Sequence, residues 1–210
     1  MKISAVIIAF NEEGKIADAI RSVSWADEIL VVDSESTDAT RQIASDLGAR
    51  VVIRSWLGFS KQKQFAVDAA KNDWIFSLDA DERVSDVLKT EILSLLEGDK
   101  TDADGYRMPR LSFYMDRPIR HSGWYPDRQL RLFDRRRAGW NERLVHESVR
   151  FRNDSKIGDL RGEILHFSVD GPEHHHKMIG ERYAPLAAEQ MFRSGIKTSP
   201  IRVAIAGPAA

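Results

Sequence analysis

Apolar residues come in short runs along the first half of the chain, and each run is followed by a stretch in which they recur at helical spacing. The first run is nearly continuous, which is typical of a strand buried on both faces. This alternation predicts βαβ units around a parallel sheet and places the chain in the α/β class. The expected strands are 3–10, 29–32, 50–53 and 74–78, and the expected helices are 12–23, 37–47, 61–71 and 84–96.

The pattern changes after Gly105. Further strand-like runs follow without a long helix between them, so we expect a mixed or antiparallel extension of the sheet. A helical pattern begins at Pro172 and continues to about Arg193, with a kink expected at Pro185 because proline removes a helical hydrogen bond. The expected strands of this part are 106–114, 129–133 and 147–151.

Length and composition fit one globular domain. The chain has 210 residues, of which 42% are hydrophobic and 30% charged. There are no cysteines, which excludes disulfides and thiolate metal sites and fits a reducing compartment. No stretch approaches the roughly 20 apolar residues of a membrane span. The apolar end, 196–210, has no closing element, so we expect it to be the start of a truncated C-terminal segment that contacts a membrane.

The net charge of −1 hides a strong asymmetry. Residues 1–105 carry 12 Lys and Arg against 20 Asp and Glu, whereas 106–152 carry 12 Arg, no Lys and 5 acidic residues. The planar guanidinium group suits phosphate and carboxylate ligands. We therefore expect the second segment to bind an anionic substrate, and the alternative is a solvated surface segment.

Polar clusters follow three of the predicted strands, at 11–13, 33–38 and 79–82. In open α/β sheets, ligands bind beyond the carboxyl ends of the strands. A ring of carboxylates at one edge is unfavourable unless a cation or a hydrogen-bonded ligand lies between them. The cluster that indicates a metal site most specifically is the pair Asp79 and Asp81, because hard divalent cations prefer oxygen ligands. This pattern predicts a site for Mg²⁺ or Mn²⁺.

The motifs AVIIAFNEE, VVDSESTDAT and WIFSLDADE resemble the inverting family 2 glycosyltransferases of the GT-A fold. The segment HSGWYPDRQLRLFDRRRAGWNERLVHESV extends the resemblance, which is greatest to the bacterial lipopolysaccharide core glucosyltransferase branch. It covers nearly the whole chain. It implies one domain with a nucleotide-sugar-binding half, 1–105, and an acceptor half, 106–195, with helices on both faces of the sheet. The family usually carries Asp-Gly-Ser after the second strand, whereas here Ser34 follows Asp33.

The resemblance implies roles for individual residues. Asp33 would bind the uracil or ribose, and Asp79 would lie near the ribose or donor sugar. Asp81, with Asp79 as the other carboxylate of the motif, would hold the metal that bridges the diphosphate of a UDP-sugar. His166 would complete the metal or diphosphate site. Further contacts to the donor are expected from Ala9, Asn11, Glu12, Ala80, Lys61 and Lys63.

Inverting transfer needs a base that deprotonates the acceptor hydroxyl. Glu147 is our first choice and Asp127 the second, and the alternative for either is a structural pair with an arginine. Acceptor contacts are expected from Arg128, Arg131 and Trp124. The branch favours UDP-glucose as the donor and an anionic glycolipid of the lipopolysaccharide inner core as the acceptor. That acceptor implies a cytoplasmic enzyme in peripheral contact with the inner membrane.

Other classes of protein fit less well. A nucleotidyltransferase acting on a sugar phosphate would have a glycine-rich basic loop after the first strand, but residues 11–13 are acidic. The same loop lacks the Gly-x-Gly-x-x-Gly of a Rossmann oxidoreductase. A non-catalytic nucleotide-sugar-binding module is disfavoured by the presence of Asp33, Asp79 and Asp81 together. Nucleic acid is not expected as a partner, since the net charge is near zero.

Overall fold

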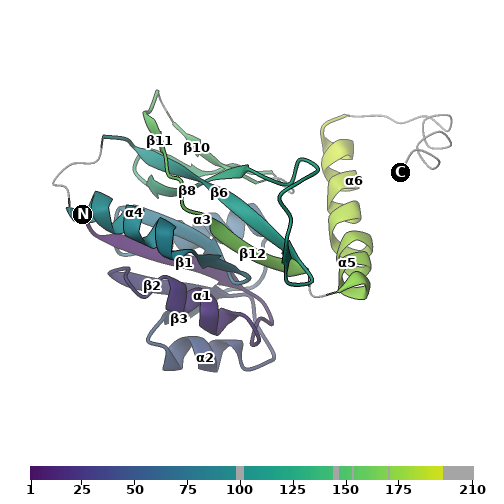
Figure 1. Ribbon diagram of the computed structural model, residues 1–210. Helices are drawn as coiled ribbons and strands as arrows, with labels where there is room; N and C mark the ends of the chain where they lie inside the picture. Colours follow the sequence, from purple (N-terminus) through teal and green to yellow (C-terminus); the bar gives the residue numbers. More distant parts are fainter. Residues whose placement is uncertain (98–101, 144–146, 153, 170, 196–210) are drawn as a thin grey trace.

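A mixed β-sheet runs through the molecule, with helices on both of its faces (Figure 1). Its first half is parallel, as the alternating pattern predicts. The computed structural model describes residues 1–97, 102–143, 147–152, 154–169 and 171–195, so the predicted C-terminal segment 196–210 lies outside the described residues. The parallel strands in spatial order are β3 (Arg50–Ile53), β2 (Glu28–Asp33), β1 (Ile3–Ala9) and β4 (Trp74–Asp79).

The central strand β1 is buried on both faces. The helices of this half are α1 (Ile16–Ser22), α2 (Thr40–Asp46), α3 (Phe59–Ala69) and α4 (Asp86–Glu97). Ile3 and Ile7 pack into a core with α1 and α4, whereas Val6 and Ile8 pack into a second core with α3. Successive side chains of a strand point to opposite faces, so a strand covered on both sides must be apolar throughout.

The second half of the sheet is mixed, which confirms the predicted extension. The antiparallel strand β8 (Asp127–Asp134) joins β4 to β6 (Gly105–Tyr114). Beyond β6 lie β12 (Ile164–Val169), parallel to it, and the short strand β5 (Glu82–Val84). Two short strands, β7 (Arg117–Pro118) and β11 (Ile157–Asp159), also pair with β6.

Two expected elements are present but differ in their bounds or their pairing. The helix expected from residue 84 begins at Asp86, because the residues before it form β5. The strand expected at 147–151 is β10 (Val149–Phe151), which pairs only with β9 (Ala138–Trp140) in a separate two-stranded sheet. The N–H of Trp140 donates a hydrogen bond to Gln64 Oε1 on α3 at 2.8 Å, so this hairpin is attached to α3.

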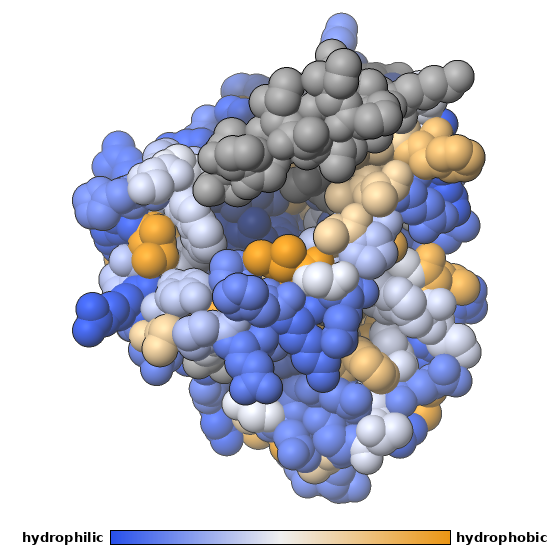
Figure 2. Space-filling view, turned by 90° about the vertical axis from the view of Figure 1, so that its right-hand side faces the viewer, coloured by the Kyte–Doolittle hydropathy of each residue, from blue (hydrophilic) through white to orange (hydrophobic). Residues whose placement is uncertain are grey.

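The C-terminal helical pattern forms α5 (Pro172–Met178), a π-helical turn (Ile179–Tyr183) and α6 (Ala184–Arg193), which stand as one column beside the sheet (Figure 1). The π turn ends two residues before Pro185, whose missing N–H removes one helical hydrogen bond. Figure 2 faces this helix and shows hydrophobic side chains among hydrophilic ones. No described helix is long and apolar enough to cross a membrane.

A close contact between α4 and residues 161–163 fixes the start of β12. The N–H groups of Arg161 and Gly162 both donate to Glu91 Oε2, at 2.9 and 2.8 Å. A methyl group added at Gly162 would lie 2.2 Å from the backbone nitrogen of Leu88. The absence of a side chain at this position therefore lets β12 approach α4 and align with β5.

We predict that Gly162→Ala destabilises the protein, because the added methyl group forces the backbones of α4 and the 161–163 segment apart. The expected loss in the free energy of unfolding is about 1–3 kcal/mol. Urea denaturation followed by circular dichroism measures it. The matched control is Gly14→Ala, where the added methyl meets nothing within 4 Å and the change should stay within about 0.5 kcal/mol. Equal midpoints for the two variants would contradict the assigned contact.

Candidate active site

A cleft of about 780 Å³ opens where β1 and β4 end, at the junction of the parallel and antiparallel halves. It is lined by side chains that are far apart in the sequence. This is the edge at which the polar clusters were expected to bind a ligand. The predicted site residues that line it are Ala9, Glu12, Lys63, Asp79, Ala80, Asp81, Asp127, Arg128, Arg131, Glu147 and His166.

Four predicted residues do not line the cleft. Asp33 is completely buried and accepts hydrogen bonds from the backbone and hydroxyl groups of Ser36. Asn11 accepts a hydrogen bond from the N–H of Thr37 at 2.8 Å, which ties the loop after β1 to the loop after β2. Trp124 is 41% exposed and lies outside the lining. The remaining residue, Lys61, is exposed.

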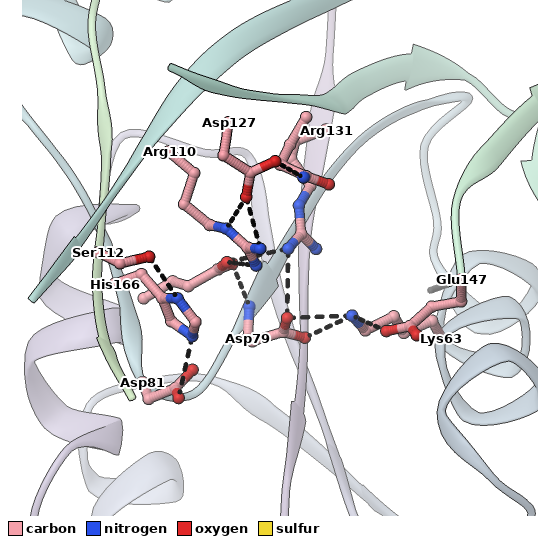
Figure 3. A network of polar contacts seen from close by, with 11 residues as sticks. Lys63, Asp79, Asp81, Arg110, Ser112, Asp127, Arg131, Glu147 and His166 are labelled. Atoms are coloured by element: carbon pink, nitrogen blue, oxygen red, sulfur yellow. Dashed lines mark hydrogen bonds and ion pairs between the residues drawn. The ribbon is translucent and has the colours of Figure 1, made fainter. Parts of the chain in front are cut away.

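Of the two predicted lysines, Lys63 lines the cleft and Lys61 does not. Residues two apart on a helix point in nearly opposite directions, so only one of the two can face the site. The side chain of Lys63 is 4% exposed, and its Nζ lies 3.0 Å from both carboxylate oxygens of Asp79 and 2.9 Å from Glu147 Oε1 (Figure 3). The ammonium group also lies over the ring of Trp140, 4.8 Å from its centroid.

Asp79, at the end of β4, is held between two cations. Besides Lys63, Arg131 Nη2 lies 3.2 Å from its carboxylate. Burial alone would raise the pKa of Asp79, but the charges of Lys63 and Arg131 outweigh it and hold the pKa well below its ordinary value. The carboxylate is therefore ionised and paired with protein cations.

Glu82 stabilises the turn that carries Asp79 and Asp81. Its carboxylate is fully buried and accepts hydrogen bonds from the N–H of Asp79 at 2.9 Å, from Arg131 at 2.9 Å and from Arg110 at 3.3 Å (Figure 3). No role is predicted from the sequence for Glu82, Arg110 or β12. The available signal was spacing, because Glu82 stands three residues after Asp79, where a side chain can reach back to a turn N–H.

Asp81 and His166 are brought together by β5 and β12. His166 lies opposite Glu82 in the pairing of these strands, and the N–H of Phe167 donates to the carbonyl of Asp81 at 2.9 Å. His166 Nε2 is 3.4 Å from Asp81 Oδ2, and its Nδ1 is 3.4 Å from the hydroxyl of Ser112. Burial raises the pKa of Asp81, but the hydrogen bond and charge of His166 lower it by more, so the net shift is downward.

The ligand atoms of Asp81 and His166 suit a metal ion that is held jointly by the protein and a bound substrate. Asp81 offers an oxygen and His166 a nitrogen, and no group of three His, Cys, Asp or Glu side chains that could hold a metal occurs within the described residues. Mg²⁺ typically binds one or two carboxylates together with substrate phosphates. The pair therefore fits a divalent cation that a bound diphosphate helps to hold, and not a cation held by the protein alone.

The two candidate bases differ in their surroundings. Asp127 Oδ2 accepts two hydrogen bonds from Arg110, at 2.9 and 2.7 Å, and its Oδ1 accepts one from Gln129 at 2.6 Å. Glu147 Oε1 accepts a hydrogen bond from Lys63 Nζ at 2.9 Å. Burial raises the pKa of Glu147, but the charge of Lys63 outweighs it and leaves the pKa below its ordinary value. The structural arginine pair considered for either residue is present at Asp127.

The arginine-rich segment has two separate uses. Arg107, Arg110, Arg128 and Arg150 line the cleft. By contrast, Arg135 donates hydrogen bonds to the carbonyls at the end of α3, at 3.1 and 2.7 Å, and thus has a structural role. Arg131, predicted to contact an acceptor, also lines the cleft but is only 2% exposed and is paired with Glu82.

Comparison with known proteins identifies the class that this fold and cleft define. The family model described as glycosyl transferase family 2 matches residues 4–157. The chain therefore belongs to glycosyl transferase family 2, whose members are transferase enzymes.

Individual relatives agree with this assignment. An uncharacterized glycosyltransferase of Rickettsia bellii is 37% identical over 97% of this chain and 72% of its own length. The lipopolysaccharide core biosynthesis glycosyltransferase LpsC of Rhizobium meliloti is 31% identical over 93% of this chain and 73% of its own length. Among solved structures, S. aureus TarS 1-349 has a TM-score of 0.53 at 15% identity and covers 85% of this chain. The chain spans 63% of that structure's length, and the likeness supports the GT-A fold.

We predict that Glu82→Gln destabilises the protein, because it leaves the buried guanidinium groups of Arg131 and Arg110 without their shared negative charge. Breaking a buried ion pair costs about 3–5 kcal/mol in the free energy of unfolding. Urea denaturation at neutral pH measures the loss. In the control Glu163→Gln the partner is the half-exposed Arg120, and the cost should not exceed about 1 kcal/mol. A loss at Glu82 no larger than that of the control would show that this pair does not hold the turn.

Proposed function

We propose that the protein is an inverting glycosyltransferase that moves glucose from UDP-glucose to an anionic glycan of the lipopolysaccharide inner core. The observation that carries this proposal is one cleft in which Asp79 lies between the pair Asp81–His166 and the pair Lys63–Glu147 (Figure 3). One pair suits the leaving diphosphate and the other suits the attacking hydroxyl. The similarity to LpsC, a lipopolysaccharide core biosynthesis enzyme by name, supports the class of acceptor.

The donor would bind across the ends of β1 and β4. Asp81 and His166 would hold Mg²⁺ or Mn²⁺, which when bound offsets the negative charge that develops on the departing diphosphate. Ala9, Ala80 and Glu12 line the cleft beside them. On this proposal residues 1–105 supply most of the donor site and residues 106–195 most of the acceptor site.

Glu147 would act as the general base. The acceptor oxygen attacks the anomeric carbon of glucose while its proton moves to the carboxylate of Glu147, and the bond from that carbon to the diphosphate oxygen breaks. UDP leaves, and the configuration at the anomeric carbon is inverted. The lowered pKa keeps Glu147 ionised at neutral pH, and the ion pair with Lys63 fixes its orientation.

The arginines of the cleft would bind the acceptor. Arg107 and Arg128 are each 45% exposed, and both are paired with Asp159 at the rim. Guanidinium groups in this position can exchange an exposed carboxylate for a phosphate of the acceptor. A lipid-linked acceptor would place the enzyme at the cytoplasmic face of the inner membrane, in peripheral contact with it.

We predict that UDP binds more tightly in Mn²⁺ than in EDTA, and that Asp81→Asn removes this difference. Loss of a metal ligand should weaken metal-dependent binding by about 100-fold or more. Isothermal titration calorimetry with UDP, GDP and CDP measures both the metal dependence and the choice of base. The control Asp46→Asn changes an exposed carboxylate at the end of α2 and should behave as the unmodified protein. Equal affinities in Mn²⁺ and EDTA would overturn the metal assignment.

We predict that Glu147→Gln lowers kcat by about 10²- to 10⁴-fold, because the amide cannot take the proton of the acceptor. The affinity for UDP-glucose should change by only a few fold. Steady-state kinetics with an inner-core acceptor measures both quantities. Asp127→Asn is the comparison. It should retain a larger kcat because both oxygens of Asp127 already accept hydrogen bonds from Arg110 and Gln129. The opposite ranking of the two variants would transfer the role of base to Asp127.

A further inference from the structure

Arg131 and Trp140 carry buried hydrogen-bond donors that have no partner among the described residues. Within the described part of the chain, Nε and Nη1 of Arg131 and Nε1 of Trp140 are buried and make no hydrogen bond. The Arg131 side chain is only 2% exposed, yet both residues line the cleft. Leaving a buried donor unpaired is costly, so such atoms indicate where a ligand supplies the acceptor.

These donors lie between the proposed diphosphate site and the proposed general base. In Figure 3, Arg131 lies above Asp79, with the pair Asp81–His166 on one side and the pair Lys63–Glu147 on the other. The ring of Trp140 lies 5.7 Å from the guanidinium carbon of Arg131 and 4.8 Å from the Lys63 ammonium group. A sugar that joins a diphosphate near Asp81 to a base at Glu147 must pass this part of the cleft.

The local charges select the chemistry of the ligand. Arg131 already lies 2.9 Å from Glu82 and 3.2 Å from Asp79, so its positive charge is offset. A phosphate or carboxylate placed here would be repelled by Asp79 and Glu147, whereas the oxygen of a neutral hydroxyl would not. Guanidinium and indole N–H groups are donors only, and they require such an oxygen. The surrounding charges are the cations Lys63, Arg110 and Arg131 and the carboxylates Asp79, Glu82, Asp127 and Glu147.

We propose that Arg131 and Trp140 form the subsite that binds the hydroxyl groups of the transferred sugar. This inference rests on the proposed function. It adds the residues that bind the sugar part of the donor. The nucleotide and diphosphate would be bound elsewhere in the cleft, so the two residues contribute to the affinity for UDP-glucose but not to the affinity for UDP.

The test is calorimetry with UDP and with UDP-glucose, both in Mn²⁺, on Trp140→Phe and Arg131→Lys. Trp140→Phe removes the N–H and keeps an aromatic ring beside Lys63, and Arg131→Lys keeps the positive charge beside Glu82. In each variant the affinity for UDP-glucose should fall by about tenfold relative to the affinity for UDP. A purely structural role would weaken the binding of both ligands together.

Matched substitutions outside the cleft serve as controls. Trp25→Phe removes an indole N–H that donates to the Ser22 carbonyl, and Arg135→Lys changes an arginine that donates to carbonyls of α3. Neither should alter the ratio of the two affinities. An unchanged ratio in Trp140→Phe and Arg131→Lys, with UDP still bound, would overturn the subsite and leave the proposed function intact. If the unmodified protein bound neither ligand, the proposed donor and the subsite would both be overturned.

Discussion

The buried carboxylate of Glu82 is the constraint on which the site depends. A charge removed from water must be paired, and Glu82 meets this requirement through Arg131, Arg110 and the N–H of Asp79. The two arginines come from β8 and β6, in the antiparallel half of the sheet, whereas Asp79 ends a strand of the parallel half. Pairing this one charge therefore fixes the two halves against each other at the point where the cleft opens.

The same pairing extends across the site as a row of alternating charges. Each member is within 3.3 Å of the next, so a shift in one side chain changes the electrostatic surroundings of its neighbours. The proposed base is thereby coupled to the turn that carries the proposed metal ligand. The members in order are Asp127, Arg110, Glu82, Arg131, Asp79, Lys63 and Glu147.

Local sequence patterns were sufficient to predict the parallel half and the position of Asp79. Strand periodicity and turn residues depend on neighbours along the chain, so the end of β4 could be located without tertiary information. The role of Lys63 could not be predicted in this way, because the inward face of a helix is set by the surface on which it packs. For the same reason β12 was missed, since its place beside β5 depends on the contact of Gly162 with α4. The resemblance that named His166 gave no account of how it reaches Asp81.

The choice between Glu147 and Asp127 shows what the structure adds to the resemblance. In the sequence both are carboxylates close to arginines, and neither can be preferred on charge. In the structure Asp127 receives hydrogen bonds on both oxygens, and two of them come from a single guanidinium group. Glu147 Oε1 accepts a hydrogen bond from Lys63, which acts as a point charge and does not impose the two-pronged geometry of a guanidinium group. A carboxylate held in this way can be oriented by one oxygen and accept a proton on the other, as the proposed displacement requires.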